Sequence, residues 1–483
     1  MNDKKIQKGC VAAFFIAVIL LALVYWGGGE QFYYRDDKTD MVTPSTVIGE
    51  ILDGKVITQQ LKLQGDIITG ITLMPAKYQE HAHGTLLVSL KKEGSVLMTQ
   101  EIPFDELPTN AKAYIHLDSP VEIPDDGILT LEITTRDTTV ENAITFYGGN
   151  TISASRAEIT LGLAEEDTVS VNGTPLEVQL STEVYTRTAL AFGHYYWYGA
   201  AGILLLLLFY LLFTMNRVNR GKRTAILRVM DEVARYRFLL KQLVSRDFKT
   251  KYKRSFLGVL WSFLNPLLTM LVQYLVFSTL FKSNVENFAL YLLVGIVCFS
   301  FFSEATSMSL TSIVGNASLI TKVYVPKYIY PLSRVISSLV NFGFSLIPLF
   351  AVMLITGAGV TKAFLLLPLG IICLFLLSLG VGLLLSSLMV FFRDMQFLWG
   401  VISMLWMYAT PIFYPESILP EQLLPLFKLN PLYHVIRFIR IILLDGISPE
   451  PKAYLLMGIA CIVPFLVGHA VFKRTEDRFI LHI

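Results

Sequence analysis

The sequence predicts an α-helical polytopic membrane protein with eight membrane spans and an inserted extracytoplasmic β-sandwich domain. Hydrophobic residues make up 53% of the 483 residues, charged residues only 16%, and the mean hydropathy is +0.55. These values are those of a membrane protein rather than a soluble domain. The apolar residues are also unevenly distributed. Several stretches reach the roughly 20 residues that a spanning helix needs, whereas residues 30–190 alternate apolar and polar side chains.

Residues 1–29 are predicted to form an N-terminal membrane anchor. The apolar stretch 9–26 follows Lys4, Lys5 and Lys8, which places the N-terminus in the cytoplasm by the positive-inside rule. A cleaved signal peptide has a similar pattern. The lack of a small-x-small cleavage site before "WGGGEQ", and the interfacial Tyr25 and Trp26, favour an uncleaved span.

Residues 30–194 are predicted to form the β domain, outside the cell. In "LTLEIT", Leu129, Leu131 and Ile133 alternate with polar residues, and turn signals such as Asp53-Gly54 and Gly148-Gly149 recur. Short strands with frequent turns predict an antiparallel sandwich. The stretch "GTLLVSLKKEGSVLMTQEIPFDELPTNAKAYIHL" resembles a jelly roll of the carbohydrate-binding or galactose-binding-like kind. A purely structural cap is the alternative.

We expect no metal site and no disulfide framework. His81 and His83 alternate onto one strand face beside Glu80, but two ligands without a third do not make a zinc site. The cysteines all fall in apolar stretches that are predicted spans: Cys10, Cys298, Cys373 and Cys461.

A second span, 195–216, opens with "HYYWY" and ends at Arg217, Arg220, Lys222 and Arg223, an aromatic belt outside and a basic flank inside. Residues 217–256 follow as a basic amphipathic helix on the membrane surface, because apolar residues recur there at steps of three to five while basic residues occupy other faces. The alternative is that these charges merely obey the positive-inside rule.

Residues 257–483 are predicted to hold a core of six further spans. We place them near 257–281, 289–312, 333–356, 364–390, 397–414 and 453–472. Eight crossings return the C-terminus to the cytoplasm. The basic residues agree, because they concentrate in the predicted inside loops and at Lys473 and Arg474.

Residues 415–444 are apolar but interrupted by Pro415, Pro420, Pro425 and Pro431. The pieces are too short to cross a bilayer, and half-spans at membrane depth are tolerated only where protein or water covers their backbone ends. We therefore expect a re-entrant segment. Glu304, within the second core span, is a functional candidate as an intramembrane carboxylate, although hydrogen bonding to neighbouring helices would also explain it.

Four stretches carry a family resemblance. They are "SRDFKTKYKRSFLGVLWSFLNPLL" (245–268), "GNASLITKVYVPKYIYPLSRV" (315–335), "FFRDMQFLW" (391–399) and "TPIFYPESILP" through "LNPLYHVIRFIR" (410–440). Together they resemble the membrane subunit of bacterial ABC exporters of O-antigen, teichoic acid and related polysaccharides. The resemblance runs from about Arg235 to the C-terminus. Simpler family members lack the first two spans and the outer domain.

The resemblance implies a permease that works as a homodimer with a separate ABC ATPase, in the bacterial cytoplasmic membrane and in contact with membrane lipid. We expect no enzyme activity, because no phosphate-cradling GK[ST] motif occurs in the chain. ATP and Mg²⁺ are expected on the partner ATPase, no cofactor on this chain, and no nucleic-acid partner. The implied cargo is a lipid-linked polysaccharide. The alternatives are export of another lipid or drug, and a membrane-anchored glycan receptor without transport.

The resemblance also suggests site residues. An ATPase-coupling helix is expected at Asn316, Leu319, Ile320, Lys322 and Pro326. A lipid-headgroup entrance is expected at Arg246, Lys249, Lys253 and Arg254. A glycan conduit is expected at Trp399, Trp406, Tyr408, Phe413 and Tyr414, with lipid-facing aromatics as the alternative. An exit gate is expected at Pro415, Pro420, Asn430, Pro431, Arg437 and Arg440, where the two arginines would share a helix face and meet lipid phosphates.

Overall fold

The computed structural model describes residues 3–39, 41–78, 83–154, 157–160, 168–220, 224–252, 258–281, 287–323, 325–420 and 422–483. The chain divides into two compact units. Unit 1 comprises Met1–Phe32 and His194–Ile483 and is helical, and unit 2 comprises Tyr33–Gly193 and is built from strands. Each unit has its own hydrophobic core.

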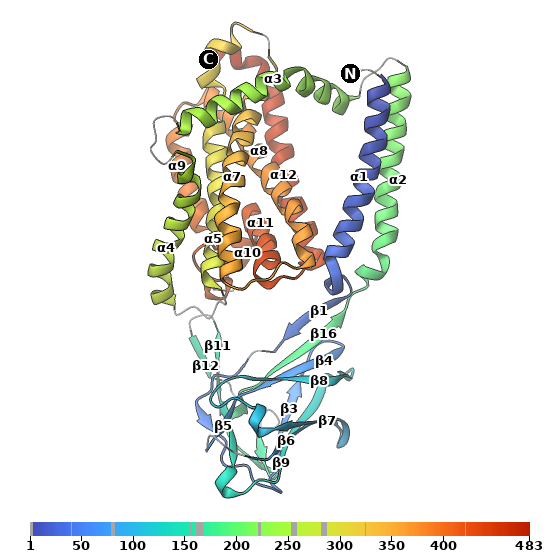
Figure 1. Cartoon of the computed structure of the whole chain (residues 1–483), viewed down its shortest axis with the longest axis vertical. Coiled ribbons are helices and arrows are strands. Elements are labelled where there is room, and N and C mark those ends of the chain that lie inside the picture. Colours follow the sequence, from blue (N-terminus) through green and yellow to red (C-terminus); the bar gives the residue numbers. More distant parts are fainter. Residues whose placement is uncertain are drawn as a thin grey trace. The chain divides into compact units, whose positions relative to one another are not determined.

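Unit 1 contains the helices (Figure 1). They are α1 (Asp3–Gly28), α2 (Phe192–Asn219), α3 (Ala225–Tyr252), α4 (Trp261–Phe281), α5 (Phe288–Leu310), α6 (Ala317–Ile320), α7 (Ile329–Ile355), α8 (Leu367–Phe391), α9 (Met395–Tyr408), α10 (Leu424–Lys428), α11 (Pro431–Arg440), α12 (Pro451–Thr475) and α13 (Phe479–His482). Among the described residues, seven helices are long and apolar enough to cross a membrane: Gly9–Phe32, Phe192–Asn219, Gly258–Ser278, Phe288–Leu310, Ile329–Ile355, Lys362–Phe391 and Pro451–His482. The chain is therefore a multi-pass membrane protein.

The predicted span at 397–414 is shorter than expected. It corresponds to α9, which has 14 residues and ends at Tyr408. At a rise of 1.5 Å per residue such a helix is about 21 Å long, less than the hydrocarbon core of a bilayer. Pro411 explains the early end, because a proline disfavours helical backbone in the residue before it. The described helices thus do not reach the predicted count of eight full spans.

The centre of unit 1 is formed by α5, α7, α8, α11 and α12. Helix α5 is buried along most of its length, whereas α1, α2 and α4 expose most of their apolar residues. Helices α8 and α12 approach closely at two glycines, since a Cβ atom on Gly468 would lie 1.9 Å from the carbonyl oxygen of Gly380. Small residues allow such backbone contact between membrane helices.

Helix α3 lies differently from the other long helices. In Figure 1 it runs across one end of the long helices of unit 1, the end where both chain termini also lie. Leu243 of α3 packs with Ile320, Val325 and Tyr330 in a cluster of buried side chains. The helix predicted within residues 217–256 is present, and residues 221–223 and 253–257 lie outside the described part.

Unit 2 consists of antiparallel sheets. One sheet has the order β1 (Tyr34–Lys38), β16 (Glu183–Ala189), β4 (Ile67–Leu73), β8 (Ala113–Glu122). A six-stranded sheet has the order β14 (Thr174–Pro175), β13 (Ser170–Val171), β3 (Ile57–Lys62), β9 (Ile128–Arg136), β6 (Thr85–Lys92), β7 (Ser95–Pro103). Strand β10 (Ile144–Gly149) pairs with β15 (Gln179–Leu180), β2 (Thr46–Val47) and β5 (Pro75–Lys77), and β11 (Thr151–Ala154) pairs with β12 (Ala157–Thr160).

The predicted alternation of strand residues is confirmed. Leu129, Leu131 and Ile133 are buried, and so are Leu86, Val88 and Leu90 of the neighbouring strand. Both larger sheets contribute to a single hydrophobic core, as in a sandwich. The jelly-roll resemblance stays a prediction.

One predicted turn in unit 2 is wrong. Gly148 and Gly149 do not form a turn but end strand β10, where Gly148 pairs with Leu180. These glycines provide close backbone approach instead, because a Cβ atom on Gly149 would lie 2.1 Å from the Thr43 carbonyl oxygen. At Asp53-Gly54 the turn is present, and Gly54 has a φ of 83°.

Of the histidines considered for a metal, His83 lies with its Nδ1 atom 3.7 Å from the Asp105 carboxylate. Glu80 and His81 fall outside the described residues. The four cysteines are buried and unpaired by disulfides.

Candidate functional site

A charged cavity lies where α3, α5 and α7 meet in unit 1. Its volume is about 580 Å³, within the range of ligand-binding pockets. The residues that line it are Arg246, Asp247, Phe248, Thr250, Lys251, Glu304, Met308, Gly315, Arg334, Ser337 and Asn341. Charged residues are rare in helices as apolar as α5 and α7. The charges gather here because the basic end of α3 meets polar residues of these two helices.

Asp247 organises the first group of charges in this cavity. Its carboxylate is only 4% exposed and lies 2.7 Å from Nη1 of Arg334 and 3.3 Å from Nη2 of Arg246. The Ser337 hydroxyl donates to it at 3.4 Å. A buried carboxylate needs such partners, so Asp247 holds both guanidinium groups at the cavity wall.

Glu304 organises the second group. It accepts hydrogen bonds from Nζ of Lys251 at 2.7 Å and from Nδ2 of Asn341 at 2.7 Å. The intramembrane carboxylate predicted from the sequence therefore has both a cationic and an amide partner, on α3 and α7. Three cationic side chains and two carboxylates line the cavity, which leaves one positive charge without a carboxylate to balance it.

The cavity includes part of the predicted headgroup entrance. Arg246 lines it, whereas Lys249 is exposed on α3 and is not one of the lining residues. Lys253 and Arg254 lie outside the described residues. Sequence reasoning did not bring Asp247, Lys251 and Arg334 together in one cavity, because Lys251 and Arg334 looked like ordinary topology charges. Their partners come from helices more than 50 residues away.

The predicted coupling segment lies next to this cavity. It begins with a 3-10 turn, Val314–Asn316, and continues as α6. Ile320 is buried and anchors the segment, Leu319 and Pro326 are partly buried, and Lys322 is exposed. The Asn316 side-chain oxygen lies 3.4 Å from both Nη atoms of Arg246, so the segment contacts the cavity wall directly.

Among its described residues, the incoming part of the predicted re-entrant segment contains a 3-10 turn at Glu416–Ile418 and the five-residue α10. The outgoing part is one helix, α11, extended by a π-helical turn, Ile441–Asp445. Pro415 and Pro420 account for the irregular first part, because proline cannot donate the helical hydrogen bond.

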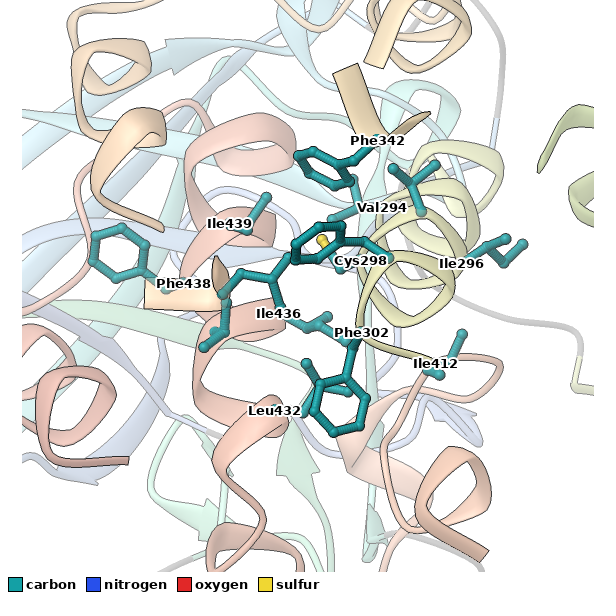
Figure 2. Packing of buried hydrophobic residues seen from close by; sticks show 14 of the residues in the cluster. Val294, Ile296, Cys298, Phe302, Phe342, Ile412, Leu432, Ile436, Phe438 and Ile439 are labelled. Atoms are coloured by element: carbon teal, nitrogen blue, oxygen red, sulfur yellow. The ribbon is translucent and has the colours of Figure 1, made fainter. Parts of the chain in front are cut away.

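Helix α11 is enclosed by protein. Its apolar side chains Leu432 and Ile436 lie on the side of Cys298 and Phe302 of α5 (Figure 2), whereas Ile439 lies against Gly370 of α8. Helices α8 and α12 pack against it as well. A short helix at membrane depth needs such cover for its backbone ends.

Asn430 connects the end of α9 with the start of α11. Its side-chain oxygen accepts from the backbone N–H of Leu432, as the N-cap before Pro431, and from Nε1 of Trp406 at 2.8 Å. Its amide nitrogen donates to Oγ1 of Thr410 at 2.7 Å. Asn430 thereby fixes the start of α11, at the turn where we predicted the exit gate.

The expectation that Arg437 and Arg440 share an accessible face is wrong. Arg437 is exposed and lies 3.8 Å from the Glu416 carboxylate, but Arg440 is only 7% exposed. The Arg440 guanidinium donates to the carbonyl oxygens of Tyr291, Pro411 and Ile412 at 2.6–3.3 Å. Its carbon lies 3.4 Å from the centroid of the Tyr291 ring. Four of the five N–H groups of Arg440 are thus used within the protein, and burial keeps its guanidinium away from a lipid phosphate.

Gly295 makes room for this arrangement on α5. A Cβ atom at Gly295 would lie 2.7 Å from Nη2 of Arg440. Neither Gly295 nor Tyr291 was singled out from the sequence, because a glycine and a tyrosine within an apolar helix carry no signal of a distant arginine.

The predicted conduit aromatics divide into two groups. Trp399 and Phe413 are buried in the core of unit 1, at 4% and 6% exposure, so in this conformation they cannot line a glycan path. Trp406 and Tyr414 are partly buried against the same core, and Tyr408 is 58% exposed. Phe413 stacks on Phe277 at 5.6 Å between centroids. The conduit prediction therefore does not hold for Trp399 and Phe413.

These features define a class. The chain is a polytopic helical membrane protein with a charged cavity lined by α3, α5 and α7, with α3 across one end of its long helices and with the short helix α11 enclosed by its neighbours. Residues 239–444 match the family model described as ABC-2 type transporter. The chain is 30% identical over 244 residues to an O-antigen export system permease protein of Klebsiella pneumoniae, covering 93% of that protein. The chain belongs to the ABC-2 type transporter membrane family.

Two other relatives agree. The O-antigen export system permease protein of Myxococcus xanthus is 29% identical over 256 residues, which are 53% of this chain and 98% of that protein. The polysialic acid transport protein of Escherichia coli is 24% identical over 249 residues, 50% of this chain and 95% of that protein. The matched half of this chain therefore accounts for nearly the whole length of these relatives, and the other half is additional.

Proposed function

We propose that this chain is the permease subunit of an ATP-driven exporter that moves a lipid-linked polysaccharide across the bacterial cytoplasmic membrane. The observation that carries the proposal is the near-complete coverage of the O-antigen export permeases. In the proposed exporter two copies of the chain form the path, and a separate ATPase supplies the energy. Both termini, α3 and the cavity face the cytoplasm, and unit 2 lies outside.

The cavity is the proposed entrance for the phosphate groups of the lipid carrier. Guanidinium groups bind phosphate through paired, charge-assisted hydrogen bonds, and an ammonium group adds a point charge. Arg246, Arg334 and Lys251 supply these groups, and one of the three positive charges is unbalanced. Asp247 and Glu304 keep the cations oriented while the site is empty.

The contact between Asn316 and Arg246 supports a route for coupling. An ATPase that moves the segment around α6 would pull on Asn316 and thereby on a cation of the entrance. In the proposed mechanism, ATP binding and hydrolysis change the affinity of the cavity for the phosphate groups. The carrier is then released toward the re-entrant segment, where the gate includes Pro415, Pro420, Pro431 and Arg437.

The test uses Arg246→Gln and Lys251→Gln, with Lys241→Gln on the same helix as the matched control. Each variant is reconstituted with the ATPase and with a lipid-linked polysaccharide, and the substrate concentration that half-stimulates ATP hydrolysis is measured. Loss of one charged hydrogen bond is worth about 1.5–3 kcal/mol, so each cavity variant should need roughly tenfold or more substrate. The control should match the natural protein.

Equal half-stimulation in all four proteins would show that the cavity is not the entrance. Depletion of the chain in cells tests the export itself. We expect the glycan to accumulate inside the cell, and surface glycan at normal levels in depleted cells would contradict polysaccharide export.

A further inference from the structure

The outward face of one sheet in unit 2 carries chemistry that membrane transport does not require. In β8, Ala113, Ile115 and Leu117 point into the hydrophobic core. Tyr114 and His116 alternate onto the opposite face and are exposed. The strands of this sheet therefore present a second, solvent-facing surface.

Aromatic rings form a platform on this surface. The Tyr114 ring is 5.0 Å from the Tyr185 ring, edge to face at 83°, and 6.4 Å from the His116 ring. Tyr114 is 55% exposed. Gly70 lies beneath it, because a Cβ atom there would lie 2.5 Å from the Tyr114 hydroxyl oxygen. Without a side chain at Gly70, the ring of Tyr114 can lie over the neighbouring strand.

A charged group flanks the platform. The Glu183 carboxylate is 7% exposed, accepts from Nζ of Lys112 at 3.0 Å and from the Tyr185 hydroxyl at 3.2 Å, and lies 3.5 Å from Nζ of Lys38. Burial raises the pKa of Glu183, but the Lys112 hydrogen bond and the charges of Lys38 and Lys112 together lower it below its usual value. Glu183 is thus charged at neutral pH. The exposed ammonium groups of Lys38 and Lys112 therefore both lie beside one carboxylate.

An unsatisfied hydroxyl lies between these groups. Thr72 pairs with Glu183 on one side and with Tyr114 on the other in the strand register. It is 2% exposed, and its hydroxyl makes no hydrogen bond within the described structure. Buried polar groups are nearly always paired, so an ordered water beneath the platform is the partner that this hydroxyl calls for.

We propose that this face binds an acidic oligosaccharide, with one sugar ring stacked on Tyr114 and its carboxylate between Lys112 and Lys38. An aromatic plane suits the apolar C–H face of a sugar, and ammonium groups suit its acid. The proposal rests on the proposed function only for the source of the ligand, which is the exported polysaccharide.

The experiment measures binding by the full-length chain in nanodiscs, using isothermal calorimetry. The probes are a sialic acid oligomer, an oligogalacturonate and, as the neutral comparison, maltoheptaose. Tyr114→Ala should weaken binding of the acidic probe about tenfold, Lys112→Gln should weaken it further at low salt, and Tyr114→Phe should restore most of the affinity. Tyr78→Ala, at a tyrosine that is 52% exposed but absent from the platform, is the matched control.

Three results would overturn the proposal. They are no binding of either acidic probe, binding that Tyr114→Ala leaves unchanged, and equal affinity for maltoheptaose. The assay needs neither ATPase nor transport. If the full-length chain binds no acidic probe but its substrate still stimulates ATP hydrolysis, the glycan site is refuted and the proposed export is not. If the chain binds the probe but no substrate stimulates ATP hydrolysis, the result counts against the proposed export.

Discussion

Arg440 links three parts of unit 1 that are distant in sequence. Its guanidinium joins the first turn of α5, the loop after α9 and the end of α11 through backbone carbonyl oxygens. A charge in such apolar surroundings is tolerated because carbonyl dipoles and the face of Tyr291 replace the lost water. Arg440 therefore adds polar contacts to the apolar packing that encloses α11.

We expect Arg440→Met to destabilise the helical unit, because carbonyl oxygens of Tyr291, Pro411 and Ile412 would lose the charged guanidinium as a donor. A hydrogen bond to a charged group is worth about 1.5–3 kcal/mol. The melting temperature in detergent, followed by size-exclusion chromatography, should fall by several degrees. Arg437→Gln, at an exposed arginine one helical turn away, should leave it unchanged. Equal melting of Arg440→Met and the natural protein would mean that the carbonyl contacts contribute nothing to stability.

At the scale of elements, the segment around α6 has one anchored and one accessible side. Ile320 and Val325 are buried, whereas Lys322 and Val323 are exposed. This division suits a segment that stays attached to the permease while it offers its other side to a protein partner. It also means that Leu319, which packs against the buried cluster, is a poorer test position than Lys322.

We expect Lys322→Glu to leave the permease folded and inserted but to remove substrate-stimulated ATP hydrolysis, because the change reverses a charge on the proposed docking side. Lys473→Glu, also exposed and at the end of α12, is the control. Copurification of the ATPase and its stimulated activity are the measurements. Normal stimulation in a well-expressed Lys322→Glu protein would exclude this segment as the coupling element.

The re-entrant path of residues 415–444 is testable by thiol labelling in a background without the four native cysteines. Leu429 is 78% exposed and Ile447 is 44% exposed, and they flank α11. An impermeant reagent added to intact cells should label Leu429→Cys and Ile447→Cys, and Lys473→Cys should stay protected. Labelling at only one of the first two positions would indicate an ordinary membrane crossing by α11.

At the scale of the whole molecule, the two units have separate cores, and the residues that match the family model, 239–444, all belong to the helical unit. We therefore expect that replacing Tyr33–Gly193 by a short Gly/Ser linker leaves unit 1 inserted, with ATP hydrolysis still stimulated by the lipid-linked substrate. Binding of the acidic oligosaccharide in calorimetry should disappear. Loss of membrane insertion in the deletion protein would show that unit 1 requires unit 2.

The sequence by itself determined the membrane class, the helix at Ala225–Tyr252, the alternating strands and the family. These follow from local properties: the length of apolar stretches, helical or strand periodicity, and motifs within about 20 residues. The strand pattern at Leu129, Leu131 and Ile133 and the position of α3 needed no knowledge of neighbours. The early end of α9 also has a local cause, Pro411. The apolar residues continue past it, so the sequence pattern alone predicted a longer helix.

Only the tertiary structure decided how each charged or aromatic side chain is used. Arg437 and Arg440 have the same chemistry and lie three residues apart, yet one is exposed and the other is enclosed by residues of α5 and the loop after α9. Lys251 looked like a topology charge until α5 brought Glu304 within 2.7 Å. Trp399 and Tyr408 share one helix but face the core and the surface. The burial and the partners of a side chain depend on contacts between segments that are distant in sequence. Composition and hydrophobic periodicity therefore cannot predict them.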